Sequence, residues 1–241
     1  MRLLIDFLKF LWLSKNEHRI HSPFVFKLYT QVISSKKKPV RAIESLRKEL
    51  LINNNVINTA NPGAGSKVHG TQQKVKKVAK SSLKSTSQAA LLYELIDYLN
   101  PKQVLELGTS FGITTAYMAQ NKSSTITTLE GAHDIAQIAN QHFKKLALTN
   151  ITLIEGDFKN TLPDYLNSID QLDFVFFDGN HQYSPTLAYF HQCKAKASDG
   201  AVFVFDDIYW SEEMKKAWQE IIVDEAVDVS IDLFHLGLVF F

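Results

Sequence analysis

Between residues 103 and 222, strand-like apolar runs alternate with helix-like runs five times. The expected strands are 103–107, 125–129, 151–155, 172–177 and 200–205, and the expected helices are 112–120, 133–147, 160–167, 185–196 and 211–222. Parallel strands need crossover connections, and the helices that make them cover both faces of the sheet. The runs FVFF and AVFVF are apolar at every position, as central strands of such a sheet are. The alternation therefore predicts an α/β fold with a mostly parallel sheet.

The C-terminal segment VDVSIDLFHLGLVFF predicts two further strands separated by a short break. A break this short allows a hairpin and excludes a crossover, so the last strand should run antiparallel. The expected sheet then has seven strands. Upstream of the first strand, Ser85 and Gln88 have the spacing of a capping box before the periodic run AALLYELIDYL, and Asn100–Pro101 ends that helix.

Residues 1–84 differ in character from residues 85–241. They carry 17 Lys and Arg against 4 Asp and Glu, a net charge of +13, whereas the remainder carries 9 against 21, a net charge of −12. We expect two parts: a basic, mainly helical extension or lid over 1–84 and a ligand-binding domain over 85–241. The basic part could attract an anionic substrate, a nucleic acid or the acidic part of the same chain.

Two segments of this extension suggest specific roles. MRLLIDFLKFLWL lacks the uninterrupted apolar run and cleavage site of a signal peptide and is too short to span a bilayer. It predicts an amphipathic helix that docks on the protein, or else contacts a membrane surface or a partner such as a second copy. The polar run NNNVINTANPGAGSKVHG predicts a long loop, either a lid or a disordered segment. The single cysteine, Cys193, excludes an internal disulfide and fits a reducing compartment, so we expect a cytoplasmic protein.

Each expected strand delivers an acidic residue near its carboxyl end, where ligands bind in open α/β sheets. These acidic residues and their neighbours are Glu106 with the loop Gly108–Gly112, Glu130–Gly131, Gly156–Asp157, Asp178–Gly179–Asn180–His181 and Asp206–Asp207. Some have a purely structural alternative: Glu130 could start a helix at the surface, and Asp157 could cap the helix that follows it. A glycine loop after a strand is by itself a weak nucleotide signal.

The acids after the fourth and fifth strands are harder to explain structurally. Ser184 and Pro185 have the types expected at the start of the fourth helix, and Ser211 has the type expected at the start of the fifth. Asp178, Asp206 and Asp207 are then left without a capping role. Three neighbouring carboxylates repel one another unless a cation lies between them, and oxygen ligands suit Mg²⁺ or Ca²⁺. We therefore predict a metal site or a cationic ligand.

Two common ligands of such a loop are a dinucleotide and S-adenosylmethionine. A dinucleotide pyrophosphate is anionic and favours a helix N-terminus free of acids. The sulfonium and α-ammonium groups of S-adenosylmethionine are cationic, so a carboxylate-lined pocket favours them. The charge of the predicted rim therefore favours S-adenosylmethionine.

The motifs LELGTSFG, TLEG, EGDF, FFDGNHQY and FDDIYW, with the terminal strand pair, resemble the class I S-adenosylmethionine-dependent methyltransferases over residues 85–241. Similarity is greatest to bacterial small-molecule O-methyltransferases with an Asp-Gly-x-His-x-Tyr signature. HSPFVFKLY and GAGSK also resemble members that carry an N-terminal extension. The resemblance implies a Rossmann-like methyltransferase sheet.

The resemblance also implies roles for individual residues. The implied cofactor-binding residues are Glu106, Gly108, Thr109, Ser110, Gly112, Glu130, Gly131, Asp157, Phe158 and Asp178, with Glu130 on the ribose and Asp157 on the adenine. The implied metal ligands are Asp178, Asp206 and Asp207, although Asp207 stands where Asn is common. His181 is the expected catalytic base beside Asp178, since histidine exchanges protons near neutral pH. Tyr183 and Trp210 are expected to line the acceptor pocket, or else to pack.

The sequence thus predicts O-methylation of a small-molecule hydroxyl, with a divalent metal as possible assistance. A nucleic-acid methyltransferase is the main alternative, although no Asn/Asp-Pro-Pro-Tyr motif follows the fourth strand and the lysines have ordinary helical spacing. A binding module that keeps the cofactor pocket without catalysis is the other. The acceptor itself does not follow from the sequence, because loops rather than the fold determine it.

Overall fold

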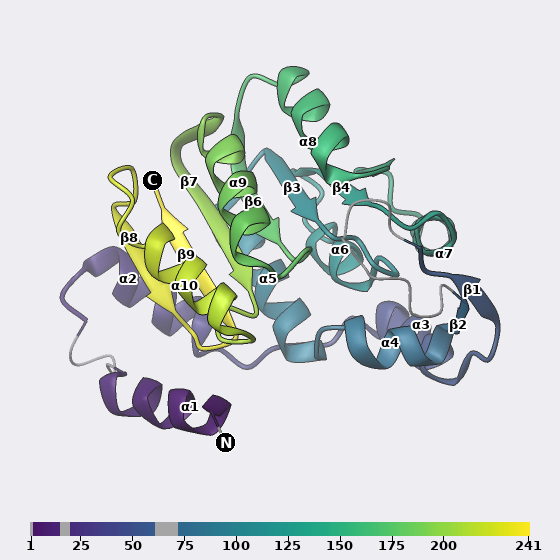
Figure 1. The fold of residues 1–241 in the computed structure, drawn as a ribbon, viewed down its shortest axis with the longest axis horizontal. Helices are drawn as coiled ribbons and strands as arrows, with labels where there is room; N and C mark the ends of the chain where they lie inside the picture. Colours follow the sequence, from purple (N-terminus) through teal and green to yellow (C-terminus); the bar gives the residue numbers. More distant parts are fainter. Residues whose placement is uncertain (1, 15–19, 61–71) are drawn as a thin grey trace.

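The computed structural model of the 241-residue chain describes residues 2–14, 20–60 and 72–241. A seven-stranded sheet crosses the molecule in the order β5-β4-β3-β6-β7-β9-β8 (Figure 1). Its strands are β3 (Gln103–Leu107), β4 (Thr125–Glu130), β5 (Ile151–Glu155), β6 (Leu172–Phe177), β7 (Ala197–Asp206), β8 (Val229–Asp232) and β9 (Leu236–Phe240). The β9 strand pairs antiparallel with both β7 and β8, and the pairings among β3 to β7 are parallel. The predicted Rossmann-like sheet with an antiparallel last strand is confirmed.

Helices cover both faces of this sheet. They are α5 (Thr86–Leu99), α6 (Ile113–Met118), α7 (His133–Lys145), α8 (Phe158–Asn167), α9 (Tyr183–Lys194) and α10 (Glu212–Ile221). Successive strand residues point to opposite faces, and this alternation divides the core. Phe203 and Phe205 of β7 pack toward α8, α9 and α10, whereas Val202 and Val204 pack toward α5. The sheet is therefore buried on both sides, as its apolar runs predict.

Most helix starts follow their predicted caps. Ser85 and Gln88 form the capping box of α5, and Ser211 caps α10 by accepting from Met214 N. The expected start of α9 is wrong, because the helix begins at Tyr183 and Ser184 lies inside its first turn. The N–H of Tyr183 donates instead to Glu213 Oε2 on α10, at 3.2 Å. A neighbouring helix thus satisfies a donor for which the sequence suggests a local cap.

The N-terminal part packs as helices beside the sheet (Figure 1). It contains α1 (Arg2–Leu13), α2 (Pro23–Leu28), a π-helical turn η2 (Tyr29–Ile33), α3 (Arg41–Ile52), the strand pair β1 (Val56–Asn58) and β2 (Gln72–Lys74), and α4 (Val75–Ser82). Ile43 of α3 and Val75 of α4 share a core with Phe111 and Tyr117 of the sheet domain. The boundary at residue 84 stays a prediction, since this core spans it. Of the predicted loop, β1 is a strand, and 61–71, which include GAGSK, lie outside the described residues.

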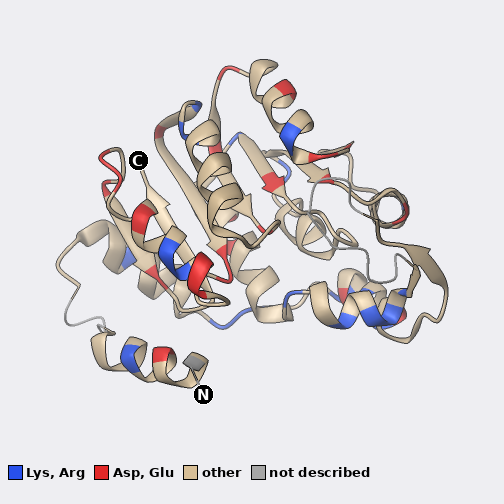
Figure 2. Cartoon of the chain, in the orientation of Figure 1, with Lys and Arg blue, Asp and Glu red and all other residues tan. Residues whose placement is uncertain are grey.

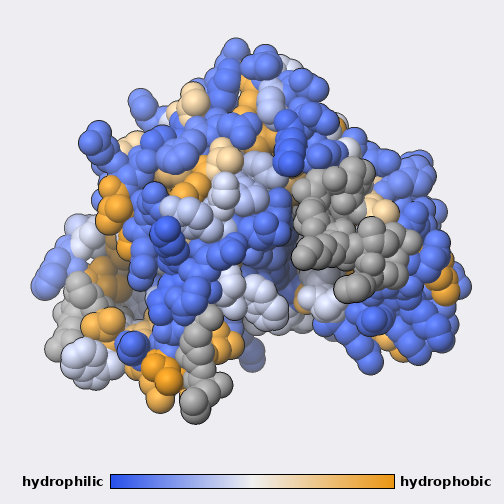
Figure 3. Space-filling model, viewed as in Figure 1, coloured by the Kyte–Doolittle hydropathy of each residue, from blue (hydrophilic) through white to orange (hydrophobic). Residues whose placement is uncertain are grey.

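Helix α1 docks on the protein through one face. Phe7 meets the ring of Phe234 edge-on at a centroid distance of 4.9 Å, and Lys215 Nζ lies 2.6 Å from Asp6 Oδ1. Its other face leaves Leu4 and Trp12 exposed, and orange atoms gather over this helix in Figure 3. None of the helices in the described part of the chain is long and apolar enough to cross a membrane.

Charges of the basic part are divided between internal pairs and solvent. Lys37 Nζ lies 2.8 Å from Glu94 Oε2 of α5, while Lys77 and Lys80 of α4 are exposed. Figure 2 shows the basic residues of α3 and α4 gathered at one end of the molecule. Pairing within the chain therefore accounts for some of the charge asymmetry, and the α4 lysines stay available to an anion.

Glu44 of α3 joins the N-terminal part to the sheet domain, and its replacement should destabilise the fold. Tyr117 Oη donates to Glu44 Oε1 and Thr86 Oγ1 to Glu44 Oε2, both at 2.8 Å. Burial raises the pKa of Glu44, but these hydrogen bonds and the charge of Arg47 outweigh it, so the pKa is lowered. A lowered pKa stabilises the fold above the unfolded value, and this stability is lost as the pH falls through the folded value.

We expect Glu44→Gln to lower the free energy of unfolding at pH 7 by about 1–2 kcal/mol, because charged hydrogen bonds are replaced by neutral ones. The difference should shrink toward pH 3. Urea denaturation at pH 3, 5 and 7 measures it, with the exposed Glu225→Gln as the matched control. A constant difference across this range would contradict the assigned role.

Candidate functional site

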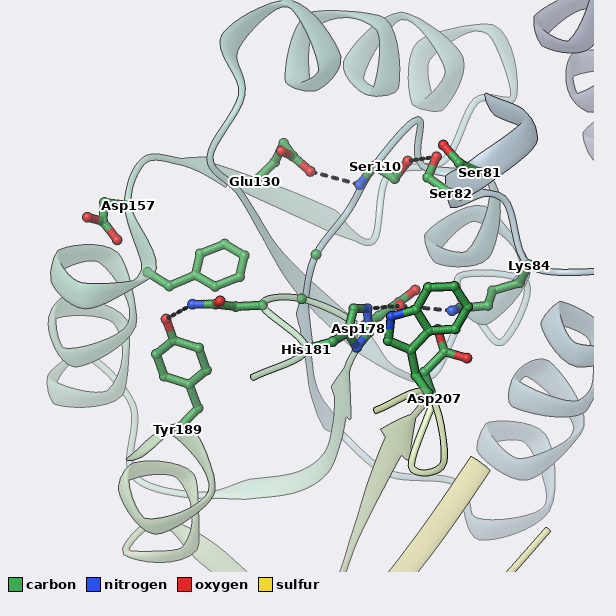
Figure 4. A pocket seen from close by; sticks show the side chains of 15 residues that line it. Ser81, Ser82, Lys84, Ser110, Glu130, Asp157, Asp178, His181, Tyr189 and Asp207 are labelled. Carbon is green, nitrogen blue, oxygen red and sulfur yellow. Dashed lines mark hydrogen bonds and ion pairs between the residues drawn. The ribbon is translucent and has the colours of Figure 1, made fainter. Parts of the chain in front are cut away.

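A cavity of about 400 Å³ opens at the carboxyl edge of the sheet (Figure 4). Its lining residues are Ser81, Ser82, Lys84, Gly108, Ser110, Glu130, Asp157, Phe158, Asp178, Gly179, Asn180, His181, Tyr189, Asp207 and Trp210. Ser81 and Ser82 end α4, Lys84 lies between α4 and α5, and Tyr189 belongs to α9; the other residues lie at or just after the carboxyl ends of β3, β4, β5, β6 and β7. The volume lies in the range of small-molecule sites. The strand-end residues predicted from the sequence therefore converge largely on one cavity.

The glycine loop is built from backbone conformations that few residues adopt. Gly108 has φ +108°, and a Cβ there would lie 2.3 Å from the carbonyl oxygen of Asp178. Gly112 has φ +74° at the start of α6, where a Cβ would overlap the ring of Phe143. Ser110 between them also has a positive φ, +49°. These conformations turn the chain sharply, so that Gly108 and Ser110 line the cavity while Gly112 packs behind it.

Glu130 at the end of β4 organises this loop. Ser110 N–H donates to Glu130 Oε2 at 2.8 Å, and Ala132 N–H donates to Oε1 at 2.9 Å. Burial raises the pKa of Glu130, and these backbone hydrogen bonds oppose the rise. A carboxylate offers about four acceptor positions, and the backbone groups of Ser110, Gly131 and Ala132 use at most three of them. The carboxylate thus retains acceptor capacity in a cavity wall, whereas the adjacent Gly131 does not line the cavity.

Asp157 combines the two roles that the sequence left open. Its side chain caps α8 by accepting from Lys159 N–H at 3.0 Å, and it also lines the cavity. Phe158 beside it is 8% exposed and lines the same wall. Tyr189 lies on the same side, with its ring edge-on to that of Phe158 at a centroid distance of 6.0 Å, and its Oη accepts from Asn180 Nδ2 at 3.3 Å.

Glu106 does not line the cavity. It is the penultimate residue of β3 and is fully buried, with Oε2 accepting from Thr115 Oγ1 at 2.5 Å and from Thr128 Oγ1 at 2.6 Å. Thr109 is buried with it, and its hydroxyl bonds Thr128 Oγ1 at 2.6 Å. Burial raises the pKa of Glu106 to about 8, although the two hydroxyl donors lower it. Glu106 therefore lies behind the glycine loop, where it can act on a ligand only through its neighbours.

The acids after β6 and β7 surround a lysine. Lys84 Nζ lies 2.9 Å from Asp178 Oδ1 (Figure 4). It also donates to Asp206 Oδ2. Burial lowers the pKa of Lys84, but the charges of Asp178 and Asp206 outweigh it, so the pKa is raised. Burial and the charge of Asp206 raise the pKa of Asp178. His181 Nε2 is 3.8 Å from Asp178 Oδ1, and burial lowers the pKa of His181.

The predicted metal ligands are only partly brought together. Asp178, His181 and Asp206 each place a ligand atom within 4.8 Å of the others, whereas Asp207, with φ +53°, belongs to the cavity wall and not to this group. Lys84 already contacts both carboxylates. A divalent ion needs the same oxygens at about 2.0–2.6 Å. In this arrangement the residues do not fit a divalent ion.

The two aromatic residues predicted for the acceptor pocket differ in position. Trp210 lines the cavity with 69% of its surface exposed, as a residue at a rim does. The expectation that Tyr183 lines the acceptor pocket is wrong. Tyr183 lines a separate shallow hollow with Glu213 and Lys216, and its hydroxyl donates to Glu220. The ring of Tyr183 therefore stacks under the Lys216 ammonium, with 4.3 Å between Nζ and the ring centroid, away from the site.

The seven-stranded sheet with an antiparallel last strand has the topology of the Rossmann-like methyltransferase fold, and a cavity lined by acidic residues opens at its carboxyl edge. In agreement, residues 105–208 match the family model described as a methyltransferase domain. The family model spans less than half of the chain.

Part of the chain is similar to curated methyltransferases. Protein-L-isoaspartate O-methyltransferase of Thermosipho melanesiensis is 33% identical over 86 residues, which cover 35% of this chain and 43% of that protein. The enzyme of the same name from Fervidobacterium nodosum is 29% identical over a stretch of the same length and coverage. The matched segment thus spans less than half of these curated relatives.

Solved structures share the fold over nearly the whole chain. The SAH-bound methyltransferase PaMTH1 of Podospora anserina has a TM-score of 0.64 at 14% identity, covering 94% of this chain and 97% of its own. The O-methyltransferase from Bacillus cereus, in complex with SAH, has a TM-score of 0.61 at 16% identity, with 90% and 97% covered. The O-methyltransferase TomG from Streptomyces achromogenes, in complex with SAM, has a TM-score of 0.60 at 15% identity, with 94% and 99% covered.

Proposed function

We propose that the protein transfers the methyl group of S-adenosylmethionine to an oxygen of a small molecule, most simply a hydroxyl. The observation that carries this proposal is the lining of one cavity by Glu130, Asp157 and Asp178 at the ends of three different strands. With Asp207 the wall has four carboxylates against one lysine, Lys84, so its charge favours a ligand with a sulfonium and an ammonium group. O-methyltransferase names among the curated relatives and fold neighbours favour oxygen as the acceptor atom.

In this proposal the cavity divides between cofactor and acceptor. Glu130 accepts hydrogen bonds from the ribose hydroxyls, Asp157 and Phe158 flank the adenine, and the backbone of Gly108 and Ser110 contacts the methionine part. The acceptor lies toward His181 and Trp210, on the side of Lys84. The backbones of Gly108 and Asp178 approach each other closely, so the cavity is narrow between the ends of β3 and β6.

Methyl transfer is an in-line displacement in which an O–CH₃ bond forms as the S–CH₃ bond breaks, and the protein mainly aligns the reacting atoms. The acceptor hydroxyl has to lose its proton. His181 is the base, because its lowered pKa leaves the imidazole neutral at physiological pH. Divalent-metal assistance would require Lys84 to leave the carboxylates, so no step depends on it. The cytoplasmic location and a homodimer stay predictions.

Titration calorimetry with S-adenosylmethionine tests the cofactor assignment. Binding by the intact protein is expected, and Glu130→Ala should weaken it about 10- to 100-fold, as charge-assisted hydrogen bonds are lost. Glu225→Ala is the matched control, because Glu225 is exposed and does not line the cavity. Folded protein that binds no S-adenosylmethionine would overturn the proposal.

Methyl transfer from labelled cofactor to phenolic, sugar and carboxylic acceptors tests the reaction. Transfer to a phenol or sugar is the expected result. Cofactor binding without transfer to any acceptor would favour a binding module. Salt-sensitive binding and methylation of RNA would favour the nucleic-acid alternative, for which the exposed α4 lysines supply phosphate contacts.

A further inference from the structure

Lys84 reaches the site from a fixed stretch of backbone between α4 and α5. It directly precedes Ser85, the cap of α5, and Arg47 Nη1 donates to its carbonyl oxygen at 2.5 Å. Arg47 is in turn held by Glu44, at 3.0 Å from Nε to Oε2. The side chain of Lys84 is 12% exposed, so its ammonium enters the site from a packed wall.

The ammonium of Lys84 lies between two carboxylates that have few other groups to neutralise their charge. Asp178 has a 12% exposed side chain and Asp206 is fully buried. Asp206 Oδ1 has no hydrogen-bond partner among the described residues. A buried carboxylate is stable only with a countercharge, so removal of the lysine from this pair is strongly unfavourable.

One donor of this ammonium remains for a ligand. A lysine ammonium carries three N–H groups, and Asp178 Oδ1 and Asp206 Oδ2 account for two of them. Within the described ranges, no third hydrogen-bond partner of Nζ is present. Lys84 lines the cavity beside His181 and Trp210, on the side where the acceptor has to lie.

We propose that Lys84 is a catalytic residue that takes the place of a divalent cation, binding the acceptor oxygen while it neutralises Asp178 and Asp206. This inference rests on the proposed function. The lysine N–H donates to the acceptor oxygen, the hydroxyl proton passes to His181, and the oxygen attacks the methyl carbon. The electron pair of the S–CH₃ bond stays on sulfur. A fixed cation at the developing alkoxide lowers its energy without an ion from solution.

Measuring how tightly the wild type and its Lys84 variants bind Mn²⁺ tests this inference, and the acceptor need not be known. Free Mn²⁺ is measured by electron paramagnetic resonance with the wild-type protein, with and without S-adenosylmethionine. The wild type should show no binding of one Mn²⁺ per chain. Lys84→Ala leaves two carboxylates and His181 without their cation, so this variant should bind one Mn²⁺ per chain, at least about tenfold more tightly than the wild type does. Lys84→Arg keeps the charge and should resemble the wild type.

Lys80→Ala is the matched control, since Lys80 is an exposed lysine on the preceding helix, α4. Stoichiometric Mn²⁺ binding by the wild type that Asp206→Asn abolishes would overturn the inference. So would a folded Lys84→Ala variant that gains no Mn²⁺. If Lys84→Ala does not fold, the wild-type and Lys84→Arg measurements still decide. Failure of the proposed function is distinguishable, because the wild type would then bind no S-adenosylmethionine in calorimetry whatever it does with Mn²⁺.

Discussion

Gly108→Ala should abolish measurable binding of S-adenosylmethionine and lower the free energy of unfolding by about 2–4 kcal/mol. The backbone of Gly108 has φ +108°, and an added Cβ would lie 2.3 Å from the carbonyl oxygen of Asp178. The obstacle is backbone, held by the hydrogen bond of 2.9 Å from Asp178 N–H to Leu107 O. Strands β3 and β6 therefore have to separate at their carboxyl ends, where the cofactor is expected to bind.

Gly200→Ala separates the cost of the positive φ from the cost of the clash with the Asp178 backbone. Gly200 also has a positive φ, +78°, but no atom lies within 4 Å of the position that a Cβ would take there. Its replacement should cost only about 1–2 kcal/mol, as is usual for a left-handed backbone, and leave cofactor affinity unchanged. Urea denaturation and calorimetry on both variants provide the comparison. A Gly108→Ala variant as stable as Gly200→Ala, with unchanged affinity, would show that the β3–β6 junction relaxes freely.

The strand ends could be predicted from the sequence because local signals determine them. Apolar runs set the strands, and parallel strands bring their carboxyl ends to one edge. Glu130, Asp157 and Asp178 consequently meet around one cavity. Glu106 differs because it precedes the last residue of its strand, and alternation turns it toward Thr115 and the helix layer. The period of two could have revealed this, since its neighbours Leu105 and Leu107 are the residues that face the opposite layer.

Lys84 could not be assigned to the site from the sequence. It lies 94 residues before Asp178 and 122 before Asp206. The segment around it is rich in lysine, and no sequence pattern distinguishes Lys84 from the other lysines. The need for a cation among the acids was visible, but its source was not. Only the packing of α3 and α4 against α5 and α6 brings this lysine to the sheet edge. Similarly, the capping of α9 by Glu213 depends on a contact between helices rather than on local sequence.

The buried carboxyl of Glu106 should make folding stability depend on pH, with a sign opposite to that of Glu44. Burial raises the pKa of Glu106 to about 8 from its ordinary value of 4.5. The protonated form is therefore favoured in the folded state. The resulting stability is fully present below the unfolded pKa and is lost as the pH rises through about 8. Each unit of such a shift corresponds to about 1.4 kcal/mol.

Glu106→Gln should remove this dependence, because glutamine matches the protonated carboxyl in shape and carries no charge at any pH. Relative to the wild type, the variant should gain a few kcal/mol in free energy of unfolding between pH 5 and pH 8.5. Urea denaturation across this range measures the difference, which isolates Glu106 from the other titrating groups. The exposed Glu225→Gln should give a curve parallel to the wild type. A parallel curve for Glu106→Gln as well would mean that Thr115 and Thr128 hold the carboxylate in its charged form.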